Sequence, residues 1–323
     1  MGIQATVAGS YPKPPDEGRP FALRRALHAV TRGDIGEDDV RRAQDDLVRD
    51  VITEQEAAGI DVVTDGCVRW DDILTPFASH MAGFEIGGLL RWFDNNVYYR
   101  RPVCVGRVEW RGPASVDGYR FAASEATRPV KAILPGPVTF ARLSVDDYYG
   151  DHERFVMDIA RVLAQEAFEL QAAGAPIIQI DEPALPGAPE DLDLAQRALG
   201  VVVAELEIET LVATYFGDCK RLGTEIFSLP VGGFGFDLVS GAENIGLIEQ
   251  APEGRRIQAG IVDARNTRLE DLDDLVMVIE DLVALRGGEA LSVSPSAGLE
   301  FLPREKARAK LQRLAEAAER VGA

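Results

Sequence analysis

The chain has 323 residues and a formal net charge of −19 at pH 7, from 34 basic and 53 acidic side chains. General binding to nucleic acids or to anionic membranes needs clustered positive charge, so this balance argues against both as partners. Hydrophobic residues make up 46% of the chain. That content is enough for a large core and excludes a wholly disordered chain.

Three cysteines, Cys67, Cys104 and Cys219, lie far apart in the sequence and form no zinc-type CxxC pair. An odd number of scattered cysteines is typical of a reduced, cytosolic protein. The first residues lack the basic and apolar pattern of a secretory signal, and no apolar run approaches the ~20 residues that span a bilayer. We expect a cytoplasmic globular protein that binds a small molecule and could form a homo-oligomer.

Short apolar runs rich in β-forming residues recur along the chain, mostly with helical segments between them. Near-continuous hydrophobic runs are typical of strands that are buried on both faces. The eight runs comprise residues 5–10, 60–66, 131–137, 176–183, 210–217, 233–241, 257–263 and 291–298.

Amphipathic segments between these runs predict helices. Residues 40–58 carry one apolar stripe and end before Gly59, where a glycine favours helix termination. Residues 269–285 carry a second stripe, and Thr267 with Glu270 has the spacing of a capping box. Residues 304–321 predict the last helix.

Eight β/α units favour an α/β fold of the (β/α)8 TIM-barrel type. The rival is a doubly wound sheet, which usually carries a glycine-rich phosphate turn after its first strand. Here the first run is followed by Tyr11-Pro12 and further prolines. We therefore expect one barrel domain spanning residues 1–323.

One stretch, residues 92–124, breaks the β/α rhythm. Its segments 95–110 and 117–124 alternate in the manner of hairpin strands. We interpret this stretch as a β-hairpin insertion after the second β/α unit.

Polar residues gather at the ends of the predicted strands, where a parallel barrel places its site. A charge there costs desolvation free energy unless it is paired or solvated, so converging acids indicate a polar ligand. Helix N-capping is the alternative role for each single acid. The candidate catalytic residues are Asp181, Tyr215, Asp237 and Cys67, and the candidate substrate-binding residues are Ser10, Asp65, Arg69, Asp72, Glu182, Asp218 and Ser296.

Two of these positions allow a closer argument. Asp181 and Glu182 are adjacent at the end of a buried run, and two acids exceed what a helix cap needs. Cys67 could be a reactive thiol because Arg69 is near in sequence, although a lone cysteine is more often a small buried side chain. Trp70, Trp92, Trp110 and the pair Tyr98–Tyr99 could form an aromatic wall, or could serve packing alone.

Six segments of the chain resemble the catalytic domain of cobalamin-independent methionine synthase. In order they are VAGSYPKP, GIDVVTDGCVRWDD, ILPGPVTFA, IIQIDEPAL, TYFGD and SPSAGLEFLPREKARAKL. The resemblance runs from about residue 5 to residue 321, so the chain is similar to a stand-alone C-terminal core of that family. It implies a TIM barrel, a zinc ion that holds homocysteine as a thiolate, and a methyl donor that this sulfur attacks.

The resemblance also implies zinc ligands at four positions. These are a His-x-Cys after strand five, a glutamate that ends strand six and a cysteine after strand eight. Here Ala213, Tyr215, Asp237 and Ala297 stand at those positions. Only Asp237 could ligate a metal, and zinc requires three or four ligands. We therefore expect a divergent member of the family with no metal and no other cofactor.

Substrate contacts follow from the same resemblance. Ser10 is similar to the family's contact with the substrate carboxylate, and Asp181 to a contact with the amino group. Cys67 occupies the place of a glutamate that holds this amino group, and Leu143 that of a tryptophan beside the folate.

The sequence is compatible with three functions. The first is transfer of a methyl or other one-carbon group to a small thiol or amino-acid acceptor, without zinc. The alternative is a metal-free lyase or decarboxylase, in which Asp65, Arg69, Asp181 and Tyr215 would serve as acid, anion clamp, base and proton donor. The second alternative is a barrel that binds a small molecule and catalyses nothing.

Overall fold

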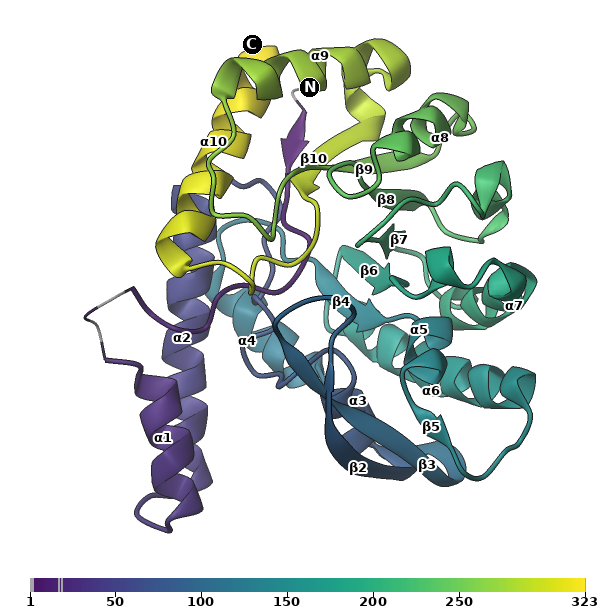
Figure 1. Cartoon of the computed structure of the whole chain (residues 1–323). Helices are drawn as coiled ribbons and strands as arrows, with labels where there is room; N and C mark the ends of the chain where they lie inside the picture. Colours follow the sequence, from purple (N-terminus) through teal and green to yellow (C-terminus); the bar gives the residue numbers. More distant parts are fainter. Residues whose placement is uncertain (1–2, 17, 19, 323) are drawn as a thin grey trace.

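The barrel sheet is parallel and follows the chain from strand to strand. The computed structural model describes residues 3–16, 18 and 20–322 (Figure 1). Seven strands pair in the order β1-β10-β9-β8-β7-β6-β4. Their bounds are β1 Gln4–Ala5, β4 Ala132–Pro135, β6 Ile177–Asp181, β7 Glu209–Thr214, β8 Gly233–Asp237, β9 Arg256–Val262 and β10 Leu291–Pro295.

The remaining predicted strand, near residues 60–66, closes this sheet into a ring. It pairs through two parallel bridges, Thr6 with Val62 and Val63 with Val130. The N–H of Lys131 donates to the carbonyl of Val63 at 2.8 Å, so this segment lies between β1 and β4. The eight predicted runs therefore form the eight positions of a barrel, and the predicted TIM-barrel fold is confirmed.

Helices cover the outside of the barrel, as in other α/β barrels. Helix α1 and the first part of α2 project together from one side, while the later part of α2 lies against the barrel and buries Leu47, Val48, Val51, Ile52 and Gln55 (Figure 1). The helices are α1 Ala22–Thr31, α2 Glu37–Ala57, α3 Thr75–Ser79, α4 Val116–Glu125, α5 Pro137–Arg142, α6 His152–Ala172, α7 Leu192–Val203, α8 Ile245–Gln250, α9 Leu272–Arg286 and α10 Arg304–Gly322. Short 3-10 helices are η1 Leu185–Gly187, η2 Pro189–Asp191, η3 Gly223–Ser228, η4 Ala242–Asn244 and η5 Gly288–Ala290. Within the ranges described, none of these helices is long and apolar enough to cross a membrane.

The observed helix boundaries agree with the predicted ones to within about three residues, whereas one of the two predicted helix ends has a different capping residue. Gly59 follows α2 with a φ of +87°, which a glycine adopts without strain. The predicted capping box at the start of α9 is wrong. Asp271 is the N-cap and accepts hydrogen bonds from the N–H groups of Asp273 and Asp274. Glu270 instead accepts a 2.6 Å hydrogen bond from Lys310 Nζ, because α10 brings a buried cation to that place.

The insertion is a β-hairpin with different boundaries from those predicted. Strands β2 Met81–Arg91 and β3 Tyr98–Trp110 pair antiparallel, and the short β5 Val145–Asp146 joins β3. The segment predicted as a later strand is helix α4, which buries Val116, Tyr119 and Ala122. Burial at every third residue is a helical period, and it outweighs the local alternation that indicated a strand.

Candidate functional site

A cavity of about 350 Å³ lies at the carboxyl ends of the strands. The loops after β1, β6, β7 and β10 line it, together with the loop that follows the barrel segment near residues 60–66. This is the expected place for a barrel site. Among the predicted residues, five line the cavity: Ser10, Cys67, Asp72, Asp181 and Tyr215.

Asp181 and Tyr215 form a buried hydrogen-bonded pair in this lining. The Tyr215 hydroxyl donates to Oδ2 of Asp181 at 3.1 Å, and the two side chains are 7% and 3% exposed. Burial raises the pKa of Asp181 to about 7, although the hydrogen bonds from Gln179 and Tyr215 favour its charged form. Burial and the nearby Asp181 carboxylate raise the pKa of Tyr215 well above its ordinary value. At neutral pH Tyr215 is therefore a donor, and Asp181 can gain or lose a proton.

Polar side chains inside the barrel hold Asp181 in place. Gln179 Nε2 donates to Asp181 Oδ1 and to the carbonyl of Ala8, both at 2.7 Å. Lys131 Nζ donates to the carbonyl of Val7 and to Gln258 Oε1, both at 2.8 Å. Burial lowers the pKa of Lys131 to about 7, while the Asp181 charge opposes this effect. The catalytic candidate thus belongs to a polar network that runs down into the barrel.

Cys67 lies in the cavity wall in a strained backbone conformation. Its φ is +51°, which is uncommon for a residue with a side chain. Its N–H donates to Asp65 Oδ1 at 2.9 Å. Burial and the Asp65 carboxylate raise the pKa of the Cys67 thiol well above its usual value. A thiol of this kind is neutral at pH 7, so the environment does not favour the predicted reactive thiolate.

Besides the exposed Asp71, two charged residues of the lining, Lys13 and Glu300, were missed from the sequence. Lys13 Nζ donates to the carbonyl of Trp70, and burial lowers the pKa of Lys13. Burial raises the pKa of Glu300 to about 7, against the effects of its own N–H and of Lys13. Both residues lie within the segments VAGSYPKP and SPSAGLEFLP that carry the family resemblance. They occupy loops beyond the strand ends and do not lie at the strand ends themselves.

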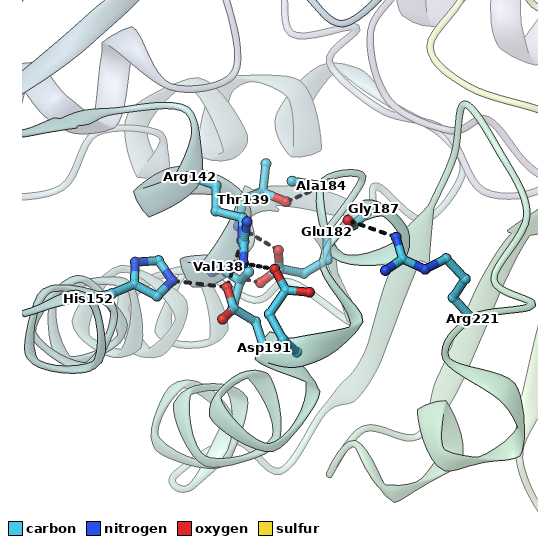
Figure 2. Close-up of polar contacts among 10 residues, drawn as sticks. Val138, Thr139, Arg142, His152, Glu182, Ala184, Gly187, Asp191 and Arg221 are labelled. Atoms are coloured by element: carbon cyan, nitrogen blue, oxygen red, sulfur yellow. Dashed lines mark hydrogen bonds and ion pairs between the residues drawn. The ribbon is translucent and has the colours of Figure 1, made fainter.

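Glu182, next to Asp181, was predicted to bind substrate but does not line the cavity. Its Oε1 accepts the N–H of Val138 at 3.0 Å, and its Oε2 accepts the N–H of Thr139 at 2.7 Å (Figure 2). Burial raises the pKa of Glu182 to about 7, while these hydrogen bonds favour the charged form. A Cβ at position 136 would lie 2.1 Å from Glu182 Cδ, so Gly136 permits this approach. Glu182 therefore fixes the start of α5 to the end of β6.

The outer side of the same region carries a separate ionic cluster. Arg142 donates to Asp191 at 2.7 Å and to Glu190 at 2.6 Å, and His152 Nε2 lies 2.9 Å from the same Asp191 oxygen (Figure 2). This cluster ties α5 to α6 and η2.

Asp237 is also engaged by the backbone and does not line the cavity. Its Oδ2 accepts the N–H of Phe216 at 3.0 Å. Its Oδ1 accepts the N–H groups of Val239 and Ser240 at 2.9 and 2.8 Å. The predicted catalytic role of Asp237 is not supported, because the carboxylate holds two loops together.

Arg69 and Asp65 lie behind the cavity wall. Arg69 forms an ion pair with Asp45 of α2, and its guanidinium lies 5.2 Å from the centre of the Phe121 ring. Asp65 accepts the hydrogen bond from Cys67, and its pKa is raised by burial. These contacts explain why neither predicted binding residue reaches the cavity.

The remaining predicted binding residues accept hydrogen bonds from backbone N–H groups. Asp218 is exposed and accepts the N–H of Lys220 at 3.0 Å, and Ser296 Oγ accepts the N–H of Ala264 at 3.3 Å. Asp72 lines the cavity and also accepts the N–H of Leu74 at 2.8 Å. Asp72 and Asp218 thus stabilise local turns, and neither is the N-cap residue of a helix.

The hairpin insertion supplies one wall of the cavity. Trp92, Val97 and Tyr98, around the turn between β2 and β3, line it together with Trp70. Of the aromatic residues considered as a wall, Tyr99 and Trp110 do not line the cavity. Phe93 in the same turn meets the ring of Phe216 at 5.3 Å between centroids. The insertion therefore packs against the loop after β7 and completes the site.

Zinc does not fit the residues at the expected positions. Ala213 and Ala297 offer no donor atom, Tyr215 donates to Asp181, and both oxygens of Asp237 accept backbone N–H groups. Among residues 3–16, 18 and 20–322, no three His, Cys, Asp or Glu side chains are grouped to hold a metal ion.

The barrel and its cavity define the class of protein, a TIM-barrel enzyme with a site at the carboxyl ends of the strands. Residues 3–320 match the family model described as cobalamin-independent synthase, catalytic domain. The chain therefore belongs to this methyltransferase family.

Individual relatives agree with this assignment. The chain is 33% identical to a methionine synthase of Sulfurisphaera tokodaii over 96% of this chain and 89% of the relative. It is 31% identical to a methionine synthase of Saccharolobus solfataricus over 97% and 93%. Its fold matches a B12-independent methionine synthase from Shewanella sp. W3-18-1 in complex with selenomethionine, with a TM-score of 0.87, 23% identity and 99% and 98% coverage. It also matches a methyltransferase from Methanosarcina mazei, with a TM-score of 0.69, 14% identity and 100% and 95% coverage.

Proposed function

We propose that the chain transfers a methyl group to the sulfur of a small amino-acid thiol, with homocysteine as the first candidate. The observation that carries this proposal is the Asp181–Tyr215 pair in the cavity of a chain that belongs to this family. Its named relatives are methionine synthases, and the proposal extends that activity to this chain.

Asp181 is the proposed general base. The acceptor sulfur attacks the methyl carbon with an electron pair and forms the S–C bond. The bond from this carbon to the donor breaks, and its electrons leave with the donor. A folate nitrogen that leaves in this way takes up one proton, which balances the proton lost by the thiol. The thiol proton passes to the Asp181 carboxylate, which Tyr215 holds through the 3.1 Å hydrogen bond.

The raised pKa of Asp181 makes this proton transfer feasible. An ordinary aspartate near pKa ~3.9 is a poor base for a thiol near ~8.5. With a pKa of about 7, the mismatch falls to roughly 1.5 units, or about 2 kcal/mol, which is a small part of an enzymatic barrier.

We further propose that the reaction proceeds without zinc. The support is the chemistry of the side chains at the four zinc-ligand positions that the family resemblance implies. Only Asp237 could coordinate a metal there, and its carboxylate already accepts three backbone N–H groups. Metal analysis of the purified protein and assays after treatment with a strong chelator test this point. Activity that survives chelation is expected, while stoichiometric zinc whose removal abolishes activity would contradict it.

The two alternatives differ in their predictions. The lyase or decarboxylase mechanism needs Arg69 as an anion clamp, but this side chain is paired with Asp45 outside the cavity. A binding protein would use the same cavity and show no turnover.

The direct test supplies purified protein with homocysteine and a ¹³C-methyl donor, either methylated folate or methylcobalamin. Labelled methionine is measured by mass spectrometry. We expect label in the wild type and a loss of at least about 100-fold in Asp181→Asn, as is typical for removal of a general base. Binding of homocysteine without label transfer from either donor would contradict the proposal and favour the non-catalytic alternative.

A further inference from the structure

We propose that Lys131 is a positioning residue for Asp181: from inside the barrel, its ammonium group favours the deprotonated carboxylate that accepts the thiol proton. This inference rests on the proposed function, because it concerns the proposed base. Lys131 does not line the cavity and so touches no substrate there. The first observation is the burial of this lysine. It is 3% exposed, although branched apolar side chains normally fill the interior of a parallel barrel.

The side chain of Lys131 crosses the interior of the barrel. Lys131 immediately precedes β4, and Ile133 lines the cavity, so the alternation of a strand turns both side chains inward. The Nζ atom of Lys131 donates to the carbonyl of Val7, after β1, and to Gln258 Oε1 of β9. Neither β1 nor β9 is a neighbour of β4 in the sheet, so the ammonium group lies within the ring of strands.

Two successive carbonyl groups connect this ammonium group to Asp181. Lys131 donates to the carbonyl of Val7, and Gln179 Nε2 donates to the carbonyl of Ala8. The same amide nitrogen of Gln179 donates to Asp181 Oδ1 at 2.7 Å. The positive charge is therefore separated from the proposed base by one peptide group and one side-chain amide. In a buried interior of low dielectric, charges interact more strongly than at the surface.

The hydrogen bonds of Lys131 do not require its charge. An uncharged amide can donate to the same oxygens, and burying an ammonium group costs free energy unless an opposite charge compensates it. The carboxylates that face Lys131 are Asp181 and Glu209, and both oppose the effect of burial on the pKa of Lys131. In return, the charge of Lys131 opposes the effect of burial on the pKa of Asp181. The ammonium and the Asp181 carboxylate thus stabilise each other.

Three further ionisable groups face Asp181. Tyr215 donates a hydrogen bond to it, and the negative charge of Glu300 opposes its ionisation. The Cys67 thiol is neutral at pH 7, because its pKa is raised well above the usual value by burial and by nearby carboxylates. Lys131 supplies the positive charge that counteracts both burial and Glu300.

Carbon-13 NMR of protein labelled at the aspartate carboxyl carbons measures the ionisation of Asp181 without turnover. The Asp181 signal is the one that is lost in Asp181→Asn. Lys131→Met has a similar volume and no charge, so it should raise the pKa of Asp181 by at least about half a unit. The value of kcat/KM should then fall about threefold at pH 6 and change little at pH 9, whereas structural damage alone would lower it at both.

Two further variants separate charge from structure. Lys310→Met is the matched control, because Lys310 is also buried, at 1% exposed, but donates to Glu270. It should lower the melting temperature and leave the pKa of Asp181 within about 0.2 of the wild-type value, since its charge is paired elsewhere. Lys131→Gln keeps an N–H donor and loses the charge. It should raise the pKa of Asp181 as Lys131→Met does, and it replaces that variant if Lys131→Met does not fold.

The inference is overturned if the Asp181 titration is unchanged in the folded Lys131 variants, if Lys310→Met shifts it equally, or if neither Lys131 variant folds. The last result would assign Lys131 to the stability of the barrel alone. The methyl-transfer assay is a separate readout. A wild type that transfers no label, but whose Asp181 titration responds to Lys131, would contradict the proposed function while supporting the effect of Lys131 on Asp181.

Discussion

The Tyr215 hydroxyl lies 3.1 Å from Oδ2 of Asp181, and this hydrogen bond favours the charged form of the carboxyl group. Because the proposed base acts only when deprotonated, kcat/KM should rise with pH through the pKa of Asp181, about 7. Tyr215→Phe removes a hydrogen bond that lowers this pKa. The rising limb of the profile should therefore move to higher pH by about one unit.

Rate profiles between pH 5.5 and 9 measure this shift. Asp181→Asn is the matched control, and its residual activity should lack the limb. A limb that stays in place in Tyr215→Phe, or that persists in Asp181→Asn, would assign the ionisation to another group.

Arg69→Gln tests the corrected position of a predicted binding residue. Loss of the Asp45 ion pair and of the contact with Phe121 should cost about 1 kcal/mol in the free energy of unfolding. The value of kcat/KM should stay within twofold, since Arg69 does not reach the cavity. Urea unfolding and steady-state kinetics give the two numbers.

Arg49→Gln is the matched control for this variant. Arg49 lies 5.0 Å from the centre of the same Phe121 ring and pairs with Glu125 on the exposed surface. A large loss of activity in Arg69→Gln but not in Arg49→Gln would restore the anion-clamp role and, with it, the decarboxylase mechanism.

Tyr98→Ala tests the hairpin wall. Tyr98 lines the cavity yet is 56% exposed, so its removal should lower the melting temperature by no more than about 2 °C. The KM of at least one substrate should rise about threefold to tenfold, because the lost ring contributes contact area. Tyr148→Ala removes a ring that is 54% exposed but does not line the cavity, and it should leave both KM values unchanged.

Glu182 should make stability depend on pH. Its pKa is raised by burial from 4.5 in the unfolded chain to about 7 in the fold, a difference that corresponds to about 3 kcal/mol. Unfolded chains lose this proton near pH 4.5 and folded chains near pH 7, so its contribution to stability falls as the pH rises through this window. Above pH 7 the full penalty is present.

Glu182→Gln removes the ionisation and keeps an oxygen acceptor for Val138 or Thr139. The free energy of unfolding of this variant relative to the wild type should therefore increase by about 2–3 kcal/mol between pH 4.5 and pH 8. Urea titrations of both proteins at the two pH values measure the change. A difference that is constant with pH, or that decreases, would show that folded Glu182 is ionised at low pH.

The barrel could be predicted because its strands are buried on both faces and read as short hydrophobic runs. Helix α4 could not, since the residues that it buries depend on what packs against it, and Tyr119 and Phe121 mimic strand alternation in the sequence. Strand-end acids could be found by position, but their roles could not be separated. Asp181 faces a cavity and Asp237 faces three backbone N–H groups, and this difference arises only from tertiary structure.

Loops account for the missed residues. Lys13 and Glu300 contribute to the site because the chain after β1 and after β10 folds back over the barrel, and no periodic pattern marks such a segment. The resemblance gave the identity of the family. That Cys67 and Glu300 both line the cavity could be seen only in the three-dimensional arrangement.

The opposite directions of Asp181 and Glu182 have a consequence for how this protein can evolve. Successive residues at a strand end face opposite sides of the sheet, so one carboxyl group enters the cavity and the next caps α5. Deleting or inserting a single residue in β6 would exchange these two sides. Active-site chemistry and the anchoring of α5 would then be lost together. Substitutions can accumulate in this strand, but its length is fixed because Asp181 must face the cavity and Glu182 must bind the start of α5.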